Sequence, residues 1–191
     1  MARRLFLLAV MLAALAECAA RPEPELLAPV APPAQLSRQV LIHVATNREP
    51  DAQHPGNFNN IHSPRLAFAR YNISIPPNHK PTAVERSTSR QVDAASSFAT
   101  LELTPLSGEV FTDQFAGGGN ATDEADGHVL VFVHGYNTKF SESVLRMAQL
   151  LADKSFFGQA ILFAWPSDDR LPGYVADKDA ATTPATTWRS C

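Results

Sequence analysis

The chain has 191 residues, of which 45% are hydrophobic and 18% charged, a balance that excludes a disordered or fibrous protein. Lys and Arg total 16 against 19 Asp and Glu, so the formal net charge is -3 and no basic excess is present for binding nucleic acid. The two cysteines, Cys18 and Cys191, lie near opposite ends of the chain and indicate no disulfide framework.

Residues 1–20 are predicted to be an export signal. Two arginines precede an apolar run over residues 5–16, which is too short to span a bilayer comfortably. The sequence Leu-Ala-Glu-Cys that ends at Cys18 is similar to a bacterial lipobox, although a small residue normally stands where Glu17 does. The alternative is ordinary cleavage near Ala20, which would discard Cys18. The chain is therefore expected in the periplasm or cell envelope, with the membrane as a partner if Cys18 is lipidated.

Residues 21–37 are predicted to form a tether. Five of the 15 prolines fall in this stretch, and each proline fixes φ and removes a backbone donor. The segment is therefore expected to be extended. The folded domain is expected over residues 38–181.

The first half of that domain favours antiparallel strands. Residues 39–46 are rich in Val and Ile and predict a strand, whereas residues 47–64 are polar and turn-rich and predict a long loop. Residues 66–75 alternate between apolar and polar and predict a half-buried antiparallel strand. Residues 98–103 alternate more weakly and predict an edge strand.

The second half favours a parallel βαβ unit. Residues 128–133 form a near-continuous apolar run, which is typical of a strand buried on both faces of a parallel sheet. Apolar residues at helical spacing follow over residues 140–151, with Asn137 or Thr138 as the expected N-cap, and residues 160–164 predict a second buried strand. The predicted fold class is α/β, with antiparallel strands ahead of the parallel part.

The candidate site is the strand end at residues 134–137. In open α/β sheets, ligands bind outside the carboxyl ends of the strands. Gly135 is expected to permit a tight turn, so that the following backbone N–H groups stabilise the negative charge of a tetrahedral intermediate. The alternative is an ordinary strand-to-helix turn with no chemical role.

Two long runs resemble a family of bacterial α/β hydrolases that are exported, esterase- or lipase-like proteins of unknown function. They are VLVFVHGYNTKFSESVLRMAQLLAD and ILFAWPSDDRLPGYVADKDAAT, and VATNREPD, LAFARYNISIPPNHKP and VDAASSFATLELTPL precede them in the order the family has them. The resemblance covers roughly residues 41–181. It implies an α/β-hydrolase fold and a small ester as the substrate of full-length relatives.

The resemblance also implies roles for the turn. The backbone N–H of Tyr136 would be one of two oxyanion-hole donors, and His134 and Gly135 would shape the turn, with His134 structural rather than a base. The second donor would follow a serine nucleophile on a Gly-x-Ser-x-Gly elbow, with an acid and a histidine later in the chain. Such chemistry implies no cofactor.

No catalytic triad is identifiable in the 191 residues. Gly-x-Ser-x-Gly is absent, and Ser107 and Ser167 do not lie where the family has its nucleophile. No Gly-x-Gly-x-x-Gly or Walker-type lysine favours nucleotide binding. The other histidines precede the turn and are too scattered for a metal site, so each is expected at the surface or in a loop: His43, His54, His62, His79 and His128.

Residues 182–191 lack any apolar pattern and are expected to be an aberrant tail. In GC-rich codons, a family-like continuation Tyr-Ser-Arg-Asp-Asp-Leu-Ala read from its second base gives Thr-Pro-Ala-Thr-Thr-Trp-Arg, which is the sequence of residues 183–189. The hypothesis is a frameshift near Thr182 that leaves an inactive, C-terminally truncated hydrolase, with residues 160–164 as an open sheet edge. The alternative is a non-enzymatic, lipid-anchored envelope module that binds a partner or is structural.

Overall fold

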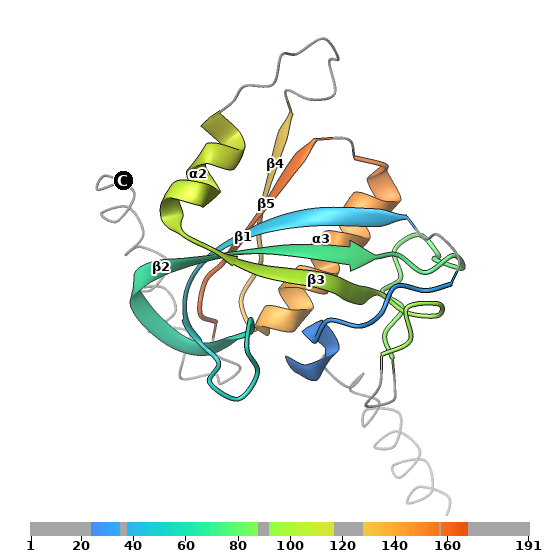
Figure 1. The fold of residues 1–191 in the computed structure, drawn as a ribbon, viewed down its shortest axis with the longest axis horizontal. Helices are drawn as coiled ribbons and strands as arrows, with labels where there is room; N and C mark the ends of the chain where they lie inside the picture. The colour runs from blue at the N-terminus through green and yellow to red at the C-terminus, as the bar shows by residue number, and fades with distance from the viewer. Residues whose placement is uncertain (1–23, 35–37, 88–91, 117–127, 157, 168–191) are drawn as a thin grey trace, which may run out of the picture.

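The computed structural model describes residues 24–34, 38–87, 92–116, 128–156 and 158–167. The predicted signal segment with Cys18, part of the tether and residues 168–191, which include the predicted tail, lie outside these residues. The described part is one open sheet with helices packed against it, as Figure 1 shows. Its elements are η1 (Pro24–Leu27), β1 (Gln39–Pro50), β2 (Phe58–Ser74), β3 (Ala99–Leu106), α2 (Gly108–Ala116), β4 (Val129–Val133), α3 (Phe140–Lys154) and β5 (Gln159–Ala164).

The five described strands lie in the order β3-β2-β1-β5-β4. Strand β2 is antiparallel to both of its neighbours, whereas β1, β5 and β4 run parallel to one another. The α/β class, with antiparallel strands leading into a parallel βαβ unit, is confirmed. Because β1, β5 and β4 share one direction, their carboxyl ends meet at one edge of the sheet.

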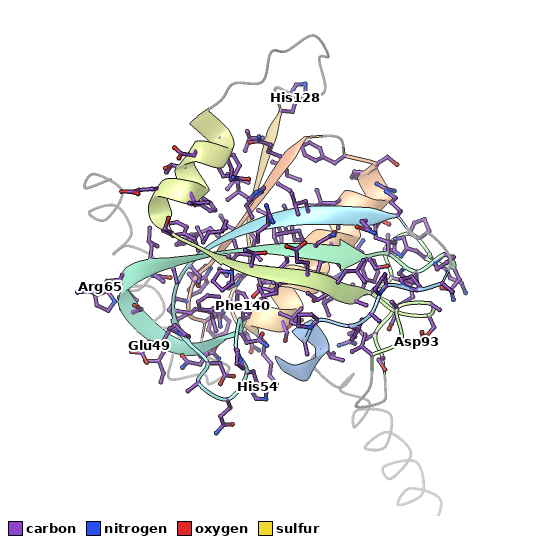
Figure 2. All side chains as sticks on the ribbon, in the orientation of Figure 1. Glu49, His54, Arg65, Asp93, His128 and Phe140 are labelled. Carbon is purple, nitrogen blue, oxygen red and sulfur yellow. The ribbon has the colours of Figure 1, made fainter. Side chains whose placement is uncertain are left out.

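The two faces of the sheet are covered by different helices. On one face, Val44 of β1 and Leu162 of β5 are fully buried in the core that also takes in Val144 and Met147 of α3. Figure 2 shows Phe140, the first residue of α3, well inside the molecule, whereas His128 lies at its rim. Burying this face removes apolar side chains from water, which favours folding.

On the other face, α2 packs against β2, where Phe111 contacts Phe68 (centroids 4.6 Å apart), and it reaches His43 of β1. The side chain of His43 is buried there, with edge contacts to the rings of Phe111 (centroids 6.3 Å apart) and Phe115 (5.0 Å). The prediction of His43 as a surface or loop residue was therefore wrong. Burial, with a smaller effect of the Arg70 charge, lowers the pKa of His43, so the neutral ring is favoured in this apolar setting.

The hairpin between β1 and β2 is longer than predicted. Residues 47–50 and 58–64, which the sequence places in a loop, are strand residues in the structure. Register shifts on either side of Arg48 show that the pairing is irregular there. Figure 2 shows Glu49 and Arg65 at the periphery of this extension. These polar residues belong to strands because backbone hydrogen bonds between β1 and β2 continue through them, and such bonds do not depend on side-chain hydropathy.

Among the described strands, β3 and β4 are the two edges of the sheet. Residues 160–164 were expected at an open edge, but β5 lies between β1 and β4, and the expected burial of residues 128–133 on both faces was also wrong. The reason is that the crossover through α3 returns toward β1, so β5 pairs with both strands. Three valines of β4 on the face opposite α3 are consequently half exposed: Val129 (52%), Val131 (58%) and Val133 (54%).

Helix α3 begins and ends differently from the prediction. Its N-cap is Lys139, whose side chain makes no capping hydrogen bond, and not Asn137 or Thr138. The helix ends where Ser155 adopts the left-handed conformation (φ 46°). The Arg38 guanidinium donates to the carbonyls of Leu151 (3.0 Å) and Ala152 (2.8 Å), which also accept the Ser155 N–H at the end of the helix.

Candidate functional site

Three buried polar side chains gather where the parallel strands end. Arg48 lies near the end of β1, His134 directly follows β4, and Ser167 lies three residues after β5. Arg48 is fully buried, and His134 and Ser167 are only 4% and 1% exposed. Buried polar groups require partners, so the contacts among them decide how the turn at residues 134–138 is held.

The imidazole of His134 is held by the indole of Trp165 and by the backbone of Gly135. Its ring stacks on the indole of Trp165, with centroids 5.4 Å apart and planes 8° apart. The Trp165 Nε1–H donates to the His134 carbonyl (2.9 Å), which links the end of β4 to the end of β5. His134 Nδ1 lies 2.8 Å from the Gly135 carbonyl, so Nδ1 carries the proton and Nε2 is left as an acceptor.

Burial lowers the pKa of His134 to about 4. The nearby positive charge of Arg48 acts in the same direction, and the bond to the Gly135 carbonyl acts against it. The ring is therefore neutral at pH 7. A neutral Nε2 suits the approach of the guanidinium, whose Nη2 lies 3.4 Å away.

The tip of the turn is exposed to solvent. Gly135, Tyr136 and Asn137 are exposed, and Asn137 adopts the left-handed conformation (φ 58°). Next to them, the Thr138 N–H donates to the Ser167 hydroxyl (3.2 Å). The turn is thus exposed at its tip and anchored at both ends.

The turn does not require a left-handed conformation at Gly135. Gly135 is not among the residues with a positive φ, because Asn137 carries the left-handed conformation instead. No atom of the described residues lies within 4 Å of the position that a Cβ at Gly135 would occupy. The absence of a side chain therefore leaves space above the backbone and does not relieve strain.

Sequence reasoning missed Arg48 and Trp165 and assigned Ser167 no role. Both missed residues lie in segments that carry the family resemblance, VATNREPD and ILFAWPSDD. The available signal was their position just after predicted strands. Of the predicted site residues, the structure brings His134, Gly135 and Tyr136 together in the turn, whereas Cys18 lies outside the described residues.

A second group of titratable side chains lies away from the turn, between the loop after β2 and the end of α3. His79 Nδ1 lies 2.8 Å from Glu85, and its Nε2 lies 2.9 Å from Asp153. Burial alone would lower the pKa of His79, but the hydrogen bonds to the two carboxylates outweigh it and raise the pKa. A hydrogen bond from the Thr82 backbone N–H lowers the pKa of Asp153, and the His79 bond lowers that of Glu85 against its partial burial.

This group contributes most to stability in mildly acidic solution. The contribution of His79 is fully present below its ordinary pKa of 6.5 and is lost as the pH rises through its raised pKa. The contribution of Glu85 is present above its ordinary value of 4.5 and is lost as the pH falls. The lowered pKa values of His43 and His134 act in the opposite direction, because they reduce stability as the pH falls below 6.5, so the test compares two proteins at each pH. We expect the urea midpoint of the intact chain to decline relative to that of His79→Gln as the pH rises above 6.5. An equal decline in both proteins would assign it to other groups.

The described residues contain no group of three or more His, Cys, Asp or Glu side chains arranged to hold a metal ion. None of the helices in the described ranges is long and apolar enough to cross a membrane.

Comparison with known proteins bears on the second half of the chain. Residues 119–189 match the model of the family described as alpha/beta hydrolase of unknown function (DUF900). No curated protein and no solved structure matches the chain. The matched range also includes residues 182–189, for which the sequence predicts an out-of-frame tail. From β4 through the turn, α3 and β5, the chain is therefore similar to α/β hydrolases of unknown function, in agreement with its mixed sheet.

Proposed function

We propose that this chain carries the oxyanion-binding part of a serine-type carboxylic ester hydrolase. The observation that carries the proposal is the turn at residues 134–138, at the carboxyl end of β4, anchored by buried groups and exposed at its tip. Its position agrees with the rule that open α/β sheets bind ligands beyond the carboxyl ends of their strands. The family match covers the whole turn.

The proposed chemistry is stabilisation of a developing negative charge. When a serine attacks an ester carbonyl, the carbonyl oxygen becomes an oxyanion that nearby N–H donors stabilise. The Tyr136 backbone N–H is the proposed donor, and the space beside Gly135 admits the oxygen close to the backbone. His134 is buried and neutral, so its proposed role is to shape the turn, not to transfer a proton.

The experiment is a titration of the chain with phenyl methylphosphonate, a tetrahedral anionic ester, followed by backbone amide NMR. We expect millimolar binding, with the largest shift changes at the amides of Gly135, Tyr136 and Asn137. Phenyl acetate, which has the same leaving group but no charge, is the control and is expected to leave those amides unmoved. Shift changes spread over the surface, or absent from the turn, would contradict the proposal.

The 191 residues are expected to show no ester turnover above the solvent rate. They contain no Gly-x-Ser-x-Gly elbow, and the buried hydroxyl of Ser167 already accepts a bond from the Thr138 N–H. The measurement is hydrolysis of 4-nitrophenyl acetate by the chain, by Ser167→Ala and by Ser107→Ala as a matched control. Turnover that only Ser167→Ala abolishes would make Ser167 a nucleophile and overturn this expectation. Absence of both ester turnover and phosphonate binding would favour a non-enzymatic envelope module.

A further inference from the structure

Arg48 is an unusual residue to find fully buried beside an exposed turn. Removing a guanidinium from water is costly unless hydrogen-bond acceptors replace the water, so the groups around it show what it holds. Two places far apart in the sequence, both in the described part of the chain, supply acceptors to it: the β2 side of the hairpin and the turn after β4.

On the hairpin side, Arg48 Nη1 donates to the Oδ1 atom of Asn60 and to the Asn59 carbonyl (3.4 Å). On the turn side, Nη2 donates to the Thr138 carbonyl (2.9 Å) and lies 3.4 Å from His134 Nε2. One planar group thus contacts the residues at both ends of the exposed tip. The planar fork of arginine suits acceptors on two sides, because its donors are spread over separate nitrogens, whereas the three donors of a lysine ammonium share one nitrogen.

We propose that Arg48 is the positioning residue of the turn, which it clamps at His134 and Thr138 and thereby orients the Tyr136 N–H. The role in orienting an oxyanion donor rests on the proposed function. The clamping of the turn by Arg48 rests on the hydrogen bonds alone. Arg48 touches no reacting atom in this arrangement. It acts indirectly, by holding the backbone of the turn against the ends of β1 and β2 that form the hairpin.

The test compares Arg48→Lys and Arg48→Met with the intact chain by amide hydrogen exchange. We expect the amides of residues 135–138 to exchange about tenfold faster in both variants, since bonds to a charged group are lost, while amides of β5 near Leu162 change less. Arg70→Met removes a more exposed arginine that pairs with Glu102 and is the matched control. It is expected to leave turn exchange unchanged.

A second readout separates a clamp on the turn from a general loss of stability. The His134 pKa, followed by imidazole NMR, is expected to rise in Arg48→Met, where the adjacent positive charge is gone, and to rise less in Arg48→Lys. Asn60→Ala removes one acceptor at an exposed position and keeps the comparison available if the Arg48 variants do not fold. It is expected to speed turn exchange by a smaller factor.

Unchanged turn exchange and an unchanged His134 pKa in the folded variants would overturn the inference. Its failure is distinct from that of the proposed function. Faster turn exchange in the variants, with no phosphonate binding by the intact chain, would keep Arg48 as the clamp and reject the oxyanion role. If Arg48→Lys left both phosphonate binding and turn exchange unchanged, the oxyanion role would be kept and the clamp rejected.

Discussion

Replacing Leu162 by Ala is expected to lower the free energy of unfolding by about 3 kcal/mol. Leu162 is fully buried in β5, between β1 and β4, and belongs to the core cluster that includes Val144 and Met147 of α3. The substitution removes apolar contacts and leaves a cavity that the surrounding strands cannot readily fill. Urea denaturation followed by circular dichroism measures the change.

The matched control for this prediction is Val131→Ala on β4. Val131 is 58% exposed, and its side chain lies on the opposite face of the sheet, so its loss is expected to cost less than about 0.5 kcal/mol. A similar cost for both substitutions would show that the face of β5 toward α3 is not the core of the folded protein.

Replacing Gly158 by Ala is expected to cost about 1–3 kcal/mol. A Cβ at this position would lie 2.5 Å from the His128 carbonyl oxygen and 2.7 Å from the Phe156 ring. The phenyl ring has freedom to move, but the carbonyl is backbone and accepts the Gln159 N–H (3.0 Å) where β5 begins beside β4. The strain therefore falls on the pairing that joins the two parallel strands.

Gly135→Ala provides the comparison for Gly158→Ala. No described atom lies within 4 Å of a Cβ at Gly135, so the same chemical change is expected to alter the free energy of unfolding by less than about 0.5 kcal/mol. Both variants are measured by the same denaturation experiment. Equal costs would contradict the crowding described at the start of β5.

The elements that local patterns specify strongly were predicted correctly. The apolar run before His134, the helical spacing from Phe140 and the second apolar run gave β4, α3 and β5 close to their observed bounds. The prediction of an open edge at residues 160–164 was wrong for a physical reason. An apolar run shows that a strand has a buried face, but which neighbour it pairs with depends on the direction of the crossover.

The site was predicted only in part, because its supports lie far apart in sequence. The turn after β4 could be predicted because an apolar run ends there in polar residues and a glycine. Arg48, by contrast, lies in a polar stretch, where an arginine is expected to be exposed. Its partner His134 lies 86 residues further along the chain. Its burial depends on the long β1–β2 hairpin, whose polar ends carry no hydropathy signal. Helix α2 was missed because it has only 9 residues.

The central claim is that residues 134–138 are the oxyanion turn of a serine hydrolase. The most direct test is to sequence the gene through and beyond the codons for residues 182–191. The account predicts that a neighbouring reading frame continues into a strand, a Gly-x-Ser-x-Gly elbow and, later, an acid and a histidine. If no frame encodes such a continuation, the hydrolase account is contradicted and the envelope module takes its place.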